Sequence, residues 1–331
     1  MSETKPVSIW DLSDLCTPWC VHVAATLRIA DHIAAGTDRI ADLAAAAGCD
    51  AYALHQVLGH LVQKGLFEEP SPGHFALNEP ARDLLHPIAR SSLDLDDIGG
   101  RFAGAWGTLL QYVRTGEPAY HEVFGRPFFD DLDANPRIAA SFDAIIGPAG
   151  HGTPDPHFEI TPGWEAVRTI ADVGGGTGAM LAEVLRAHPN LRGILVDRPI
   201  TVDRSTEIFE AAGVAERVTL AAQSFFDPLP PGADVYLLRG ILNDWPDREA
   251  LAILRRCADA LPPAGCVVVL KSVSPDDTPK DITIEVILLG GKHRTLSEFK
   301  ALALQAGLEV IAAGQQPSGY YVVECRRLTD D

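Results

Sequence analysis

The stretch "DVGGGTGAM", residues 172–180, decides the fold of this chain. It follows the apolar run "RTIA" and leads into "LAEVLRAHP", so it joins a predicted strand to a predicted helix. Glycines allow a tight turn in which the backbone approaches a ligand without a Cβ in the way. The start of a helix also presents free N–H groups to a ligand. The stretch therefore predicts the loop of a Rossmann-like domain that binds a nucleotide-type cofactor.

Strands and helices alternate along the chain that surrounds this loop. Predicted helices separate most of the predicted strands, which are "GILVD", "VTLAAQSF", "DVYLLRGIL" and "CVVVLKSV". The closing stretch "LEVIAAGQQPSGYYVVECRR" predicts a terminal hairpin. Alternation at this spacing predicts an α/β fold with a parallel, doubly wound sheet.

The first ninety residues differ in composition: they are rich in Ala and Leu, and their apolar residues recur with helical periodicity. Residues 17–36 predict one amphipathic helix, and residues 39–65 predict a helix-turn-helix. The stretch "LFEEPSPGHFALN" then predicts two short strands, which completes a winged helix. Six Lys and Arg against eleven Asp and Glu leave residues 1–90 with a net charge of -5, which disfavours DNA binding and favours a dimerisation module.

We predict three parts: a winged-helix dimerisation domain (1–90), a helical linker that contributes to the substrate pocket (91–160) and a Rossmann-like catalytic domain (161–331). The net charge of -18 over 331 residues argues against nucleic acid and against an acidic membrane surface as partners. The sequence has no apolar run long enough to cross a membrane. Nor does it begin like a signal peptide, so we expect a cytoplasmic protein.

The six cysteines are scattered, and only Cys16 and Cys20 are close, at an i, i+4 spacing without a matching second pair. This pattern predicts neither a disulfide framework nor a metal site, and we expect buried free thiols.

Two residues beyond the glycine-rich loop strengthen the cofactor prediction. Asp197 ends the next strand, where a carboxylate accepts hydrogen bonds from ribose hydroxyls. Phe225 follows the strand after that and is placed to lie against an adenine.

Five stretches occur in the order and spacing of a known family: "DVGGGTG", "VDRP", "FFDPLP", "LLRGILNDWPD" and "GGKHRT". The chain resembles the S-adenosylmethionine-dependent small-molecule O-methyltransferases, which include plant caffeate-type enzymes and actinomycete enzymes of polyketide tailoring. Its "VAATLRIADHIAAG" and "SFDAIIG" look like the anthracycline-tailoring branch. The resemblance extends over nearly the whole chain and implies a class I methyltransferase fold and a homodimer.

The resemblance also implies which residues bind S-adenosylmethionine. Gly174 and Gly176 would hold its methionine part, and Asp197 its ribose. Ser224 stands where many members have an Asp that pairs with the adenine. Arg239 stands where a Lys or Arg commonly meets the carboxylate of the cofactor.

The catalytic positions depart from the family pattern. Asn243 occupies the place of the histidine base in the plant enzymes' "HDW", and an amide has no useful pKa for that role. Lys271 and His293 stand where two glutamates orient that histidine.

Three interpretations of this departure remain open. The chain can methylate oxygen with alignment alone or with a relocated base, for which His293 is the first candidate and His121 and His151 are weaker ones. It can methylate carbon, with Asp244 and His293 touching the substrate or a metal, although Asp244 also suits the N-cap of the following helix. It can also keep the cofactor without methyl transfer, as a hydroxylase, decarboxylase or pericyclase.

We therefore predict an S-adenosylmethionine-dependent methyltransferase that acts on a small aromatic hydroxylated secondary metabolite, with O-methylation favoured over C-methylation.

Overall fold

The glycine-rich stretch joins β3 (Thr169–Val173) to α13 (Ala179–Ala187), as predicted. Gly174, Gly176 and Gly178 have φ angles of 71, 62 and 82°, in the left-handed region that L side chains rarely adopt. Glycine at these three positions lets the chain leave the buried strand and turn into the helix without strain.

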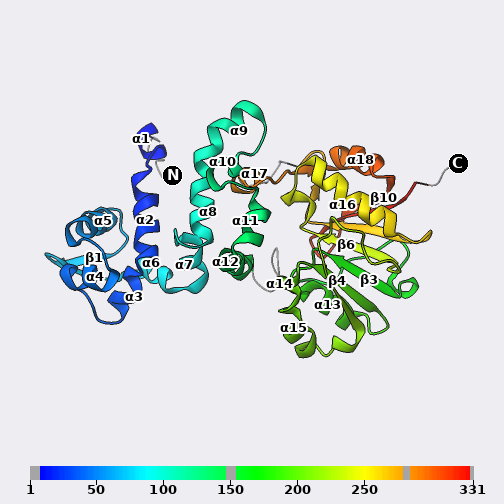
Figure 1. The fold of residues 1–331 in the computed structure, drawn as a ribbon, viewed down its shortest axis with the longest axis horizontal. Helices are drawn as coiled ribbons and strands as arrows, with labels where there is room; N and C mark the ends of the chain where they lie inside the picture. Colours follow the sequence, from blue (N-terminus) through cyan, green and yellow to red (C-terminus); the bar gives the residue numbers. More distant parts are fainter. Residues whose placement is uncertain (1–7, 147–153, 279–283, 329–331) are drawn as a thin grey trace, which may run out of the picture. The chain divides into compact units, whose positions relative to one another are not determined.

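A computed structural model describes residues 8–146, 154–278 and 284–328 of the protein (Figure 1). The chain divides into two compact units. One comprises Met1–Gly107 and Leu132–Ile145, and the other comprises Thr108–Asp131 and Ile146–Asp331. The three-part division at residues 90 and 160 stays a prediction about domain organisation.

The second unit is built on a seven-stranded sheet with the order β10-β11-β7-β6-β3-β4-β5. Strands β3 to β7 run parallel, whereas β11 pairs antiparallel with β7 and with β10. The predicted doubly wound sheet and its terminal hairpin are thus confirmed. Besides β3, its strands are β4 (Arg192–Asp197), β5 (Val218–Ala222), β6 (Val235–Arg239), β7 (Cys266–Leu270), β10 (Leu308–Gln315) and β11 (Tyr321–Arg327).

Helices cover both faces of this sheet (Figure 1). Alternate residues of the strands pack against α16 (Asp247–Ala260) and α18 (Leu296–Gln305) on one face. The remaining residues pack against α13 and α15 (Ser205–Ala211) on the other face. Burial on both faces explains why β6 and β7 are apolar nearly throughout rather than alternating with polar residues.

Shorter elements complete the second unit. They are α9 (Leu109–Thr115), α10 (Tyr120–Phe124), α11 (Phe128–Ala134), which continues into the first unit, α14 (Pro199–Val202), α17 (Ile284–Leu288), and the small strands β8 (Val273–Ser274) and β9 (Arg294–Thr295).

The first unit contains the predicted winged helix. The helix pair α4 (Ile40–Ala47) and α5 (Ala51–Gln63) precedes the antiparallel hairpin of β1 (Glu68–Ser71) and β2 (His74–Ala76). Its other helices are α1 (Ile9–Leu12), α2 (Cys16–Thr26), α3 (Ile29–Ala34), α6 (Glu79–Arg82), α7 (Pro87–Leu93), α8 (Ile98–Ala105) and α12 (Pro136–Ile146).

Two sequence predictions about this unit are wrong. The single helix over residues 17–36 is broken into α2 and α3, because Arg28 adopts a left-handed φ of 56°. The cysteines are not all buried either: Cys16 is exposed, and Cys20 and Cys49 are half-buried, whereas Cys257, Cys266 and Cys325 are buried as expected.

The chain therefore has a Rossmann-like α/β fold with an N-terminal, mainly helical domain. Within the described residues no helix has the length and apolarity to cross a membrane. The cytoplasmic location stays a prediction.

Candidate functional site

The sheet order reverses direction between β3 and β6. From β3 the chain crosses to β4 and β5 on one side, and then to β6 and β7 on the other. Ligands of open α/β sheets bind at such a point, outside the carboxyl ends of the strands. Each predicted cofactor residue follows or ends one of these strands, so the topology brings Gly174, Asp197 and Arg239 to one edge of the sheet.

The carboxylate of Asp197 is held against the glycine-rich loop. The Gly176 amide donates to Asp197 Oδ2 at 2.8 Å, and the Arg198 amide donates to Asp197 Oδ1 at 2.7 Å. A Cβ built on Gly176 would meet no atom within 4 Å, which leaves open space above the loop. Backbone donors, a fixed carboxylate and an open glycine surface fit the ribose and methionine parts of S-adenosylmethionine.

The other glycines of the loop are packed closely. A Cβ on Gly174 would lie 2.6 Å from the Ile241 side chain and 3.4 Å from the Phe225 ring, and one on Gly178 would lie 2.2 Å from the Phe209 ring. These positions hold the loop against its neighbours, so alanine at either of them would displace it.

A buried carboxyl group and a buried guanidinium group lie below the loop. Asp172, which is 1% exposed, and Arg239, which is 6% exposed, interact from neighbouring strands. Burial raises the pKa of Asp172 to about 7, although Arg239 opposes this shift. Arg239 is thus not a surface charge. Asp172 was not predicted as a site residue from the sequence, because it reads there as the end of a strand.

Aromatic rings line the region beside the loop. Phe225 and Phe226 both meet Trp245 edge-on, at ring distances of 5.9 and 5.0 Å. The Trp245 ring also stacks on Phe129 of α11 at 4.5 Å. The Ser224 hydroxyl accepts from the Phe226 amide at 3.2 Å, which fixes the turn that presents these rings. Flat aromatic walls of this kind suit planar ligands.

Asn243 links two polar side chains. The Ser272 hydroxyl donates to Asn243 Oδ1 at 2.9 Å, and Asn243 Nδ2 donates to Asp244 Oδ1 at 2.9 Å. The amide nitrogen thus faces Asp244 and the amide oxygen faces Ser272. Desolvation raises the pKa of Asp244 to about 7. Asn243 therefore orients a carboxyl group that titrates near neutral pH, which is the range for general acid–base catalysis.

The expectation that Asp244 caps the following helix is wrong. Helix α16 has Pro246 at its N-cap, without a side-chain capping bond, and Asp244 instead ends the 3-10 turn Leu242–Asp244. The extra turn moves Asp244 away from the first turn of α16 and beside Asn243.

Arg294 fixes the backbone on both sides of Asn243 and Asp244. Its side chain is 1% exposed and donates to the Leu242 carbonyl at 2.6 Å and to the Trp245 carbonyl at 2.8 Å. It also pairs with Asp247 Oδ1 at 2.9 Å. Sequence reasoning missed this residue, because an arginine in "GGKHRT" reads as surface charge.

The two residues at the family's glutamate positions lie differently from that pattern. His293 Nε2 is hydrogen-bonded to Ser274 Oγ at 2.7 Å. The side chain that contacts Asn243 from this strand end is Ser272 and not Lys271. Lys271 has a left-handed φ of 59° and reaches over the Tyr320 ring, with Nζ 5.5 Å from its centre. Of the weaker base candidates, His121 is exposed on α10 and His151 lies outside the described residues.

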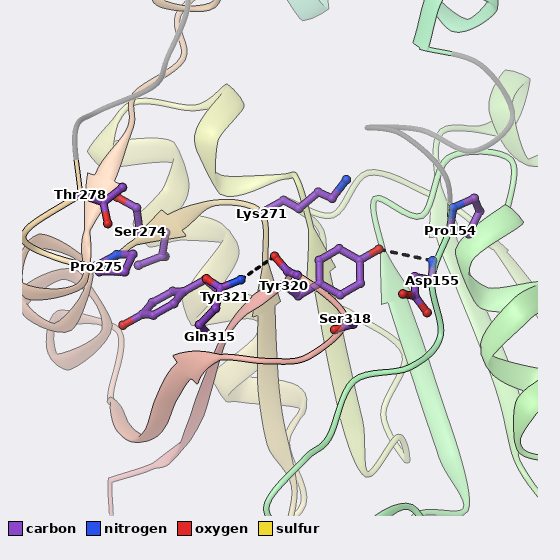
Figure 2. A pocket seen from close by; sticks show the side chains of 12 residues that line it. Pro154, Asp155, Lys271, Ser274, Pro275, Thr278, Gln315, Ser318, Tyr320 and Tyr321 are labelled. Atoms are coloured by element: carbon purple, nitrogen blue, oxygen red, sulfur yellow. Dashed lines mark hydrogen bonds between the residues drawn. The ribbon is translucent and has the colours of Figure 1, made fainter.

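Ser274 and His293, which are hydrogen-bonded to each other, each line a cavity. One, of about 680 Å³, is lined by Ser274, Lys271, Asp155 and Tyr320 among others, and Figure 2 shows the lysine extending over the tyrosine. The other, of about 700 Å³, is lined by His293, Tyr112 and Pro246 among others. Both volumes are in the range of small-molecule sites.

Comparison with known proteins agrees with this geometry. The sequence pattern of the O-methyltransferase domain matches residues 106–309. The chain is 40% identical over 310 residues to 2,7-dihydroxy-5-methyl-1-naphthoate 7-O-methyltransferase of Streptomyces carzinostaticus. This match covers 91% of this chain and 92% of that protein. It is 38% identical to aclacinomycin 10-hydroxylase of Streptomyces purpurascens, over 95% of this chain and 86% of that protein.

A solved structure shares the fold at the same level of identity. It is the O-methyltransferase NcsB1 of neocarzinostatin biosynthesis in complex with S-adenosylmethionine and 2-hydroxy-5-methyl naphthoic acid. It superposes with a TM-score of 0.84 at 38% identity, over 98% of this chain and 99% of that chain.

The fold and the glycine-rich site define a class I methyltransferase. The chain belongs to the O-methyltransferase family and is an S-adenosylmethionine-dependent methyltransferase.

Proposed function

We propose that this enzyme methylates a hydroxyl group of a small bicyclic or polycyclic aromatic acid in secondary metabolism, with Asp244 as the proton acceptor. The observation that carries the proposal is the chain of hydrogen bonds from Ser272 through Asn243 to Asp244. It orients a carboxyl group of suitable pKa beside the position where the family's histidine is missing.

The cofactor supplies a methyl group on a positively charged sulfur. Gly174, Gly176 and Asp197 would hold it in the loop after β3, with Ser224 and Phe225 on the adenine side and Arg239 toward its carboxylate. Most of the rate gain in such a transfer comes from holding the two reactants in line. The rings around Trp245 exclude water from that alignment.

Proton removal completes the reaction. A phenol has a pKa of about 10, so it becomes a better nucleophile when a carboxylate oxygen of Asp244 takes its proton. Asn243 holds Asp244 in place and Arg294 holds the backbone that carries both. His293, bonded to Ser274, is the second candidate for the base.

Two comparisons and one side chain support an aromatic acid as the acceptor. The relative at 40% identity is named for a dihydroxynaphthoate, and NcsB1 is solved with a naphthoic acid. In this chain Lys271 lines a cavity of about 680 Å³, and burial and the charge of Arg239 lower the pKa of Lys271. We propose that Lys271 binds the carboxylate of the acceptor.

Turnover with matched acceptors tests this function. The purified enzyme is offered S-adenosylmethionine with hydroxynaphthoic acids and with their methyl esters, and products are followed by mass. We expect methylation of the acids, and a Lys271→Met enzyme with a raised KM for the acids but not for the esters. Equal KM values for acid and ester in the wild type would contradict the role of Lys271.

Removal of Asp197 is expected to weaken cofactor binding. Asp197→Ala should lose about 1–3 kcal/mol of binding free energy, because a hydrogen-bonded carboxylate at the ribose is gone. Calorimetric titration with S-adenosylhomocysteine measures the effect. Asp203→Ala, an exposed acid shortly after the same strand, is the matched control and should bind normally. Equal affinities for the two variants would remove Asp197 from the cofactor site.

We also propose a homodimer formed through the N-terminal helices. Residues 9–19 expose five large apolar side chains between 48 and 79%, namely Ile9, Trp10, Leu12, Leu15 and Trp19. So many apolar side chains exposed within one short segment indicate a protein interface.

Charge placed on this apolar segment should dissociate the dimer. Trp10→Asp combined with Leu12→Asp is expected to shift the sedimentation mass from dimer to monomer, because the interface would bury two unpaired carboxylates. Leu304→Asp, at a leucine of α18 that is 55% exposed, should remain dimeric. A wild-type protein that sediments as a monomer would refute the proposal.

A further inference from the structure

Two thiols and one imidazole converge in the N-terminal unit. Cys16 and Cys20 lie one turn apart on α2, with their Sγ atoms 3.9 Å from each other. His60 approaches them from α5, and one of its ring nitrogens and both sulfurs lie within 4.8 Å of one another. The sequence could not predict this group, because His60 is forty residues beyond Cys20.

The neighbours of His60 prepare its ring for ligation. The Thr17 hydroxyl donates to Asp14 Oδ2 at 2.5 Å. The oxygen of this hydroxyl, Thr17 Oγ1, lies 2.8 Å from His60 Nε2. A hydroxyl has a single proton, and Thr17 gives it to Asp14. The Thr17 oxygen therefore accepts from the ring. In the neutral ring the other nitrogen keeps its lone pair, the form that binds metals.

The spacing of the sulfurs suits a tetrahedral metal ion. Two thiolates at about 2.3 Å from Zn²⁺ in tetrahedral geometry are separated by about 3.8 Å. A disulfide needs sulfurs about 2.0 Å apart, so the thiols are not bonded to each other in this conformation. Thiolate and imidazole ligands favour Zn²⁺ over Mg²⁺ or Ca²⁺, which prefer oxygen.

We propose that Cys16, Cys20 and His60 form a Zn²⁺ site with water in the fourth position. The ion would join α2 to α5 and stabilise the N-terminal unit through its binding energy. Zinc binds thiolates, so ligation must displace thiol protons, and zinc affinity is expected to rise with pH.

Metal titration of the full-length protein tests the site. The protein is reduced, stripped of metal and titrated with Co²⁺ and then with Zn²⁺. We expect a thiolate-to-cobalt charge-transfer band that zinc abolishes, one zinc ion bound per chain, and a higher melting temperature with zinc. Cys16→Ser and His60→Gln should each lose the band and weaken zinc binding by more than the roughly 10–100-fold typical of an outer-shell change. Thr17→Val, which removes an outer-shell partner, should weaken it by about 10-fold.

Controls separate a built site from incidental thiol binding. Cys49→Ser removes a half-buried thiol elsewhere in the same unit and should leave the cobalt band unchanged. Cys16 is exposed, so Cys16→Ser should fold, and a metal-free melting temperature equal to that of the wild type checks this. Three results would overturn the proposal: no cobalt band in the wild type, an equal band in Cys16→Ser, or a Cys16–Cys20 disulfide that forms readily in the protein as purified.

Discussion

Asp244→Asn is expected to lower kcat for methyl transfer by about 100-fold or more, because it removes the group that takes the acceptor's proton while keeping its shape. Cofactor affinity should not change, since Asp244 is not among the residues proposed to bind S-adenosylmethionine. The wild-type rate should rise with pH through about 7, because desolvation raises the pKa of Asp244 to that value and only its ionised form accepts a proton. In Asp244→Asn this rise should be lost.

His293→Gln is the comparison that makes the experiment decisive. If Asp244 is the base, this variant loses the bond to Ser274 but no proton acceptor, and it should keep most of the turnover. A large loss in His293→Gln with a small one in Asp244→Asn would transfer the role to His293. Small losses in both would mean that alignment alone drives the reaction.

Arg294→Ala should destabilise the protein by about 1–3 kcal/mol, the cost of leaving a buried acceptor without its donor. The variant leaves the carbonyls of Leu242 and Trp245 without their buried donor. Denaturant unfolding measures the loss. Arg248→Ala is the control: this arginine follows Asp247 in α16, but its side chain is 91% exposed, so its loss should cost less than about 1 kcal/mol.

Arg294→Lys tests positioning apart from stability. Lysine keeps the positive charge but not the planar fork that reaches both carbonyls and Asp247. The loop that carries Asn243 and Asp244 should then shift, and displacement of about 1 Å can cost about 100-fold in rate. We expect kcat to fall with little change in cofactor affinity. A fully active Arg294→Lys enzyme would show that the fork does not position this loop.

The fold was predictable because its signals are local. The apolar strands, the glycine-rich loop and the terminal hairpin each show their pattern within a few residues, and β3, α13, β10 and β11 were found where predicted. The break at Arg28 was not predictable, since neither glycine nor proline marks it and its φ of 56° is decided by the packing of α2 and α3.

The site was only partly predictable because its contacts span long distances along the chain. Asn243 and Asp244 were recognised as an anomaly, but the hydroxyl that orients them comes from Ser272, and the buried cation that holds their backbone comes from Arg294, fifty residues away. A buried arginine and an exposed one look alike in a sequence. Burial also decides the pKa of Asp172 and Asp244, and no local pattern reveals it.

The hydroxylase among the relatives makes the fate of the methyl group the central question. We would incubate the enzyme with a hydroxynaphthoic acid and S-adenosylmethionine that carries heavy carbon in its methyl group, and record the carbon resonance of the product. A labelled methyl ether is the predicted result. Label attached to a ring carbon, or no transfer by an enzyme shown in the same sample to bind both ligands, would contradict O-methylation.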